Sequence, residues 1–141
     1  MRRADGGPAS PTPTAAQQGV IRLSLLASVL LFGGVVAWLA SQGRVPPSGR
    51  PADEGTVRFL RMLAPAIAVA AAVAATYLRY VISRTADAAR AWPLRLVAWA
   101  VGEAAALLGA VHWFLSGDPS RYVIGLVALL ATFVVVPLRA R

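Results

Sequence analysis

Four long apolar stretches constrain this chain more than any other feature of its sequence. They cover residues 20–41, 62–82, 94–115 and 122–138. Because an α-helix rises 1.5 Å per residue, each is close to the roughly 20 residues that cross about 30 Å of hydrocarbon. A helix also closes its backbone hydrogen bonds within one segment, whereas a membrane barrel would show short alternating strands. The sequence therefore predicts an all-α fold, an integral membrane four-helix bundle.

The composition indicates that the solvent around most of this chain is lipid. Residues of the set AVILMFWYC make up 57% of the 141 residues, and only 14% are charged. A soluble domain this small would keep much more of its surface polar. All fourteen basic residues are Arg, in a chain rich in Ala, Gly and Pro. This bias indicates a GC-rich bacterium, and hence the bacterial inner membrane as the location.

Two absent residue types exclude several kinds of chemistry. The chain has no Cys, which excludes disulfides, thiolate metal sites, iron–sulfur clusters and covalent haem. It has no Lys, which excludes a Schiff-base cofactor and a phosphate-binding lysine. No metal cluster, cofactor motif or nucleophile–base pair is visible, so we expect no cofactor, no metal and no catalytic residue.

The chain divides into a short tail and one membrane domain. Residues 1–19 are rich in Pro, Ala, Ser, Thr and Gly, and we expect a disordered N-terminal tail because such a segment buries little apolar surface. Residues 20–141 then form the four-helix transmembrane domain. The apolar run after Arg22 is too long for a typical signal-peptide core, which favours a retained signal anchor.

The arginines predict the orientation of the bundle. One side, with both termini and the second connection, holds Arg2, Arg3, Arg22, Arg79, Arg84, Arg90, Arg95, Arg139 and Arg141. The other side holds Arg44, Arg50, Arg58, Arg61 and Arg121. The count of nine arginines on the first side against five on the other favours both termini in the cytoplasm, since positive residues are retained there. A net charge of +8 could also suggest nucleic-acid binding, but arginines on two membrane faces form no single basic stripe. We expect membrane lipids as partners and no nucleic acid.

One acidic residue lies deep within a predicted span. Glu103 is nine residues, or about 13 Å, into the third span, close to the bilayer midplane. Since a charge there costs about 2.5–3.5 kcal/mol, we expect the group to be protonated, buried or hydrogen-bonded. Ser28 and Thr132 fall at comparable depth and are possible hydrogen-bond partners. Glu103 is either a structural acid that ties helices together or a group that handles protons or cations.

His112, the only histidine, is a weaker candidate for a functional site than Glu103. It follows Glu103 by nine residues, which at 100° per residue puts it on the opposite face of the helix. The two side chains cannot form one acid–base pair within the chain. Next to Trp113 and near the end of the span, His112 is expected to be a polar interfacial residue.

Small residues recur at every fourth position along two of the expected helices. They are Ala98, Gly102, Ala106 and Ala110 in the third, and Ala64, Ala68 and Ala72 in the second. Such stripes let helix backbones approach closely in lipid. We expect tight helix packing along both stripes, with the alanine-rich second helix in the centre of the bundle.

The segment 100–109, AVGEAAALLG, resembles the carboxylate helix of the rotary ATP synthase c subunit, in which a mid-membrane Glu is followed six residues later by Gly. The alanine-rich preceding helix and the basic connection are also similar. The resemblance covers the middle half of the chain. This sequence departs from the c subunit in three ways: the second helix lacks a regular glycine repeat, Leu108 replaces a usual Tyr, and two further helices flank the middle pair. Small bacterial membrane proteins with a Glu-bearing third helix are similar too. The resemblance implies proton translocation at Glu103.

These observations leave two functional interpretations. The first is a non-enzymatic accessory or assembly subunit that acts through helix contacts with other membrane subunits or with its own copies. The second is a proton- or cation-linked membrane subunit that uses Glu103.

Overall fold

The computed structural model describes residues 13–46 and 53–138, and in these residues it contains four α-helices and no strand. The helices are α1 (Ala15–Ser41), α2 (Glu54–Arg84), α3 (Ala88–Ser116) and α4 (Ser120–Val135). The predicted all-α class is therefore confirmed. Three of them, α1, α2 and α3, are long and apolar enough to cross a membrane, whereas α4 is apolar but shorter.

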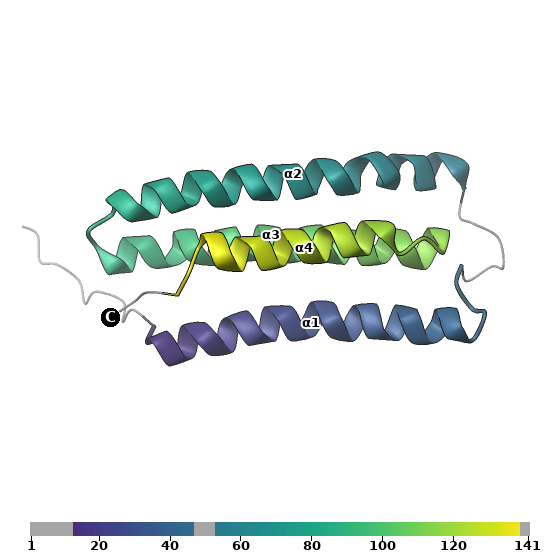
Figure 1. Cartoon of the computed structure of the whole chain (residues 1–141), viewed down its shortest axis with the longest axis horizontal. Coiled ribbons are helices and arrows are strands. Elements are labelled where there is room, and N and C mark those ends of the chain that lie inside the picture. The colour runs from purple at the N-terminus through teal and green to yellow at the C-terminus, as the bar shows by residue number, and fades with distance from the viewer. Residues whose placement is uncertain (1–12, 47–52, 139–141) are drawn as a thin grey trace, which may run out of the picture.

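The helices lie side by side, with α3 as the central one (Figure 1). Its most extensive contact is with α4, and it also packs against α2 and α1. Helix α2 touches both α3 and α4, but α1 and α2 lie on opposite flanks without contact. The prediction that the second helix occupies the centre is therefore wrong. Its small residues support contact on one side only, while those of α3 face several neighbours.

The alanines of α2 show why the fourfold spacing was misleading. The buried ones are Ala64, Ala68, Ala71 and Ala75, whereas Ala72 is exposed. Intervals of four, three and four residues follow the helical period of 3.6 more closely than repeated steps of four. The contact stripe of α2 consequently runs straight along one face.

Helix α1 begins before the predicted span. Its N-cap is Thr14, whose hydroxyl accepts from Gln17 N while the Gln17 side chain accepts from Thr14 N. This reciprocal capping box starts the helix at Ala15, inside the segment expected to be a tail. The rest of that expectation concerns residues 1–12, which lie outside the described residues.

Helix α3 also begins earlier than expected. Asp87 caps it by accepting from Ala89 N at 2.8 Å, so the helix starts six residues before the predicted span. It ends at Gly117, whose φ of +80° is the left-handed conformation that glycine adopts most easily. Hydropathy identifies only the apolar part of a helix, while side-chain caps fix its ends.

Helix α4 is shorter than its predicted span of residues 122–138. Its 16 residues reach about 24 Å, less than the about 30 Å of a hydrocarbon core. Pro137 explains the early stop, because it has no N–H to donate to Phe133 O four residues before. The carbonyl groups at this end of α4 therefore need donors from elsewhere in the protein.

Glycines permit the close packing of α3 against α4. A Cβ atom at Gly109 would lie 2.3 Å from Arg121 O, and one at Gly125 would lie 2.5 Å from Ala105 O. At Gly102 the nearest atom would be Thr132 Oγ1 at 2.6 Å. Because two of these obstacles are backbone atoms, the two helices could not approach so closely with larger residues.

The start of α1 and the end of α4 lie at the same end of the bundle (Figure 1). Of the described arginines, this end holds Arg22, Arg79, Arg84, Arg90 and Arg95, and the other holds Arg44, Arg58, Arg61 and Arg121. The difference of five to four is small. The larger predicted margin rests on five arginines at positions 2, 3, 50, 139 and 141, which lie outside the described residues.

Candidate intramembrane carboxyl site

Glu103 is the sixteenth of the 29 residues of α3, so it lies close to the middle of that helix. Its side chain is partly buried, on the side of α3 that faces α1. No ion pair involves Glu103 in the part of the chain that the structure describes. The carboxyl group thus depends on hydrogen bonds at a depth where lipid supplies none.

Ser28 of α1 supplies one such bond. Its hydroxyl oxygen lies 2.5 Å from Glu103 Oε1 and 2.8 Å from Leu25 O. Ser28 is itself exposed, so the pair lies at the open edge of the contact between α1 and α3. The structure therefore joins two polar side chains at mid-depth but covers neither of them completely.

A hydroxyl has one hydrogen, so Ser28 can donate to only one of these two acceptors at a time. When Glu103 is ionised, the Ser28 hydroxyl can donate to the carboxylate. When Glu103 is protonated, its own O–H can donate to Ser28 Oγ while Ser28 donates to Leu25 O. Both protonation states fit the same positions of the heavy atoms.

Thr132 does not take part in this pair. It is 1% exposed, and its hydroxyl donates to Leu129 O at 2.7 Å within α4. It faces Gly102, which is on the side of α3 toward α4. Equal depth in the bundle was thus not enough to make Thr132 a neighbour of Glu103.

The small-residue stripe of α3 lies fully inside the bundle. Ala98, Gly102, Ala106 and Ala110 are all buried, and Gly109 extends the same surface. Gly102 and Gly109 meet α4, while Ala106 packs with Val29 of α1 and Leu129 of α4. The stripe therefore packs against other helices of this same chain.

His112 is buried, with 0% exposure, and does not lie at the surface as an interfacial residue would. Its Nδ1 is 3.3 Å from the hydroxyl oxygen of Ser116. That pair resembles a nucleophile and a base, but the Ser116 hydroxyl donates to His112 O at 2.7 Å. The bond to the backbone of the same helix is the shorter of the two, and it competes with the imidazole for the one hydrogen of Ser116.

The end of α4 forms a cluster that sequence reasoning missed. Arg22 Nη2 of α1 donates to Phe133 O, Arg79 Nη1 of α2 donates to Val135 O at 3.3 Å, and Trp99 Nε1 of α3 donates to Val136 O at 3.1 Å. Each of the other three helices thus supplies a donor to the carbonyl groups of α4. Two of the donors are cations, which the negative end of the helix dipole favours. The one sequence signal for this cluster is Pro137, which has no N–H and so leaves Phe133 O without its usual donor in the helix.

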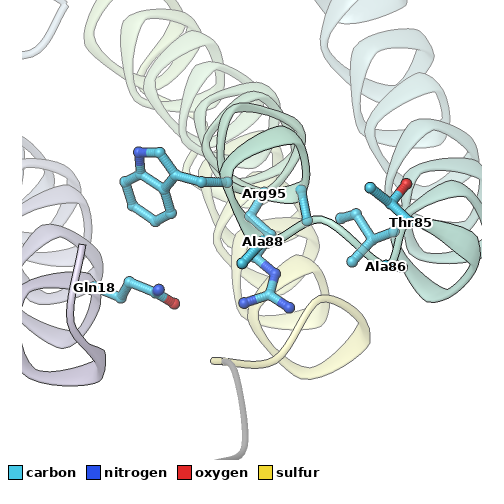
Figure 2. Close-up of a pocket in the computed structure, with 8 residues that line it drawn as sticks. Gln18, Thr85, Ala86, Ala88 and Arg95 are labelled. Carbon is cyan, nitrogen blue, oxygen red and sulfur yellow. The ribbon is translucent and has the colours of Figure 1, made fainter. Parts of the chain in front are cut away.

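A small polar pocket lies at the same end of the bundle, between α1 and the turn that joins α2 to α3. Gln18 and Arg95 direct their polar groups into it from two helices, and Thr85 lines its far side (Figure 2). Gln18 is 2% exposed, and its Oε1 has no partner among the described residues. A volume of about 60 Å³ is enough for about two water molecules, and a water here could donate to Gln18 Oε1.

Comparisons with known proteins do not assign the chain to a family. No protein-family model matches the chain, and neither a curated protein nor a solved structure matches it significantly. These comparisons do not test the resemblance to the ATP synthase c subunit, which stays a prediction. The fold and its sites define an all-α chain with three helices capable of crossing a membrane.

Proposed function

We propose that this chain is a non-enzymatic accessory or assembly subunit in a bacterial inner membrane, with both termini in the cytoplasm. Its contacts with a partner are made by helix faces within the bilayer. The observation that carries this proposal is the Ser28–Glu103 pair, which lies open at the edge between α1 and α3. Polar groups at this depth almost always face protein or water, so a further helix is expected to cover the pair.

The loose attachment of α1 supports the same proposal. It packs mainly on α3, has little contact with α4 and none with α2. Exposed apolar side chains cover the rest of its surface, including Leu31 and Val35. A helix bound on one narrow face leaves a long surface for another membrane subunit.

Photo-crosslinking tests the proposed contact. Val35 lies seven residues after Ser28, on the same face of α1, whereas Leu30 lies about 200° from Ser28, on the other side. Both side chains are 49% exposed, so they form a matched pair. A photoreactive residue at position 35 should give a protein adduct of discrete mass in native membranes, and one at position 30 should give lipid adducts only.

The same experiment can overturn the proposal. Lipid adducts alone at both positions, or the same protein adduct at both, would show that this edge binds no specific partner. Glu103→Ala provides a further control, because loss of the polar pair should weaken the adduct at position 35 while leaving the protein folded.

The geometry of Ser28 also favours a second candidate function, in which Glu103 binds and releases protons or cations. The Ser28 hydroxyl can keep a hydrogen bond with Glu103 in either protonation state of the carboxyl group, because it can change its own acceptor. Glu103→Gln distinguishes the candidates, because Gln keeps hydrogen bonding but cannot ionise. For a proton-linked subunit it should abolish whatever function is lost on deleting the gene, at unchanged protein level. For the accessory subunit it should be tolerated.

A further inference from the structure

A groove runs between α1 and α4 at the end of the bundle that holds the start of α1. Its volume is about 430 Å³, within the 300–1,000 Å³ of ordinary ligand sites. Its apolar walls are Leu23, Leu26, Val134 and Leu138. Within the described part of the chain, Arg22 is the only charged residue that lines it. The groove therefore combines a long apolar surface with one cation.

Arg22 has a fixed position in this groove. Its guanidinium lies over the rings of Trp99 and Phe133, at 5.0 and 4.7 Å from their centres. Its Nη2 donates to Phe133 O and lies 3.5 Å from Val136 O. These contacts hold the cation against the end of α4, where the side chain cannot turn freely to water.

Among the described residues, no carboxylate balances the charge of Arg22. No ion pair involves Arg22 among the described residues, and the end of α4 supplies only about half a negative charge. A guanidinium has five N–H donors, and in the described residues only those on Nη2 have protein acceptors. A partly buried cation with unused donors is stabilised by an anion.

The apolar walls show what kind of anion would fit. A free inorganic anion would satisfy Arg22 but would leave the apolar groove empty. A phospholipid supplies both a phosphate for the guanidinium and an acyl chain for the groove. We propose that the groove between α1 and α4 binds one anionic phospholipid, with its phosphate at Arg22 and an acyl chain along Leu23, Leu26 and Leu138.

This site is separate from the proposed partner surface. Gly19, Leu23 and Leu26 lie on the edge of α1 that faces α4, whereas Ser28 lies on the edge that faces Glu103. The lipid would lie between α1 and α4, two helices with little direct contact. It would therefore complete the attachment of α1 without using the surface left for a further subunit.

Native mass spectrometry of the full-length chain in detergent tests this proposal. The chain is titrated with phosphatidylglycerol, with phosphatidylcholine and with inorganic phosphate. We expect one phosphatidylglycerol to bind about fivefold more tightly than phosphatidylcholine, the difference that one basic group near a lipid surface provides. Inorganic phosphate should not displace it at equal concentration.

Three variants identify the site. Arg22→Gln should remove the preference for the anionic lipid. Gly19→Leu should block the groove without disturbing the fold, because a Cβ atom at Gly19 meets nothing within 4 Å. Arg90→Gln is the control, since Arg90 is at the same end of the bundle but is exposed and paired with Asp87.

Three results would overturn the proposal. The first is equal binding of the two lipids by the natural chain, and the second is an unchanged preference in Gly19→Leu. The third is equal displacement by inorganic phosphate, which would reduce the site to an anion site. If Arg22→Gln does not fold, Gly19→Leu decides the question alone, because it keeps every contact of Arg22.

Discussion

The pair α3–α4 and the flanking helix α1 use small residues in opposite ways. Between α3 and α4, Gly109 and Gly125 bring one backbone directly against the other. On α1, Gly34 faces open space, and only Gly33 is opposed, by the side chain of Tyr122. The first contact is therefore rigid and continuous, whereas the second depends on a few side chains. Small residues predict close packing only where a neighbouring backbone is present.

The few polar contacts of α1 show how it is held. Tyr122 donates to Val29 O at 3.2 Å, Arg22 donates to the end of α4, and Ser28 is bonded to Glu103. On α1 these contacts fall between residues 22 and 29, within a helix that runs from Ala15 to Ser41. They fix the register of α1 without requiring a wide buried face.

The largest expected effect is the loss of the α3–α4 pair. Gly125→Leu would place a branched side chain where a Cβ alone would lie 2.5 Å from Ala105 O, and backbone atoms cannot move aside cheaply. We expect a loss of about 3 kcal/mol or more in the free energy of unfolding. Unfolding in mixed micelles, followed by circular dichroism, measures this loss. A loss below about 1 kcal/mol would show that the helices are not in backbone contact.

A smaller effect is expected at the end of α4. Trp99→Phe keeps an aromatic ring in the core but removes the N–H that donates to Val136 O. Val136 O would keep only the long contact of 3.5 Å with Arg22 Nη2, so we expect a loss of about 1–3 kcal/mol in the free energy of unfolding. The same unfolding measurement applies, and Trp92→Phe is the control because Trp92 is less buried and packs edge-on against Trp99. Equal effects of the two changes would argue against the carbonyl cap.

The smallest expected effect concerns the attachment of α1. Gly33→Ala would place a Cβ 2.2 Å from the Tyr122 hydroxyl oxygen, so the ring must move and its bond to Val29 O is lost. The cost should be about 1 kcal/mol, since a side chain can yield where backbone cannot. Gly34→Ala, one residue further, meets nothing within 4 Å and should be neutral or slightly stabilising. Equal effects of Gly33→Ala and Gly34→Ala on the free energy of unfolding would argue against the contact of Tyr122 with α1.

The sequence was most informative about elements and least informative about neighbours. Continuous apolar runs predicted four helices, because hydropathy depends on local composition. The period of 3.6 residues placed Glu103 and His112 on opposite faces of α3, which agrees with Glu103 facing α1 and His112 being buried elsewhere. It could not say which helix each face would meet. Ser28 and Thr132 were equivalent by depth alone, and only the three-dimensional packing distinguishes them.

Helix ends and charged side chains were harder to predict for a related reason. The end of α4 follows from Pro137, but the donors for its carbonyl groups come from Arg22, Arg79 and Trp99, each on a different helix. These residues lie between 37 and 114 positions away from their acceptors. No local pattern connects residues across such separations, so the cluster had no signature beyond the proline.

The central claim is that Glu103 lies at an open edge of the bundle that a partner covers in the native membrane. A hydrophobic carbodiimide reacts with protonated carboxyl groups in apolar surroundings, so it reports directly on access to Glu103 from the lipid side. The purified chain should gain one adduct that is absent in Glu103→Gln, and the same chain in its native membrane should react far more slowly. No adduct on the purified chain, or equal rates in the two settings, would contradict the account.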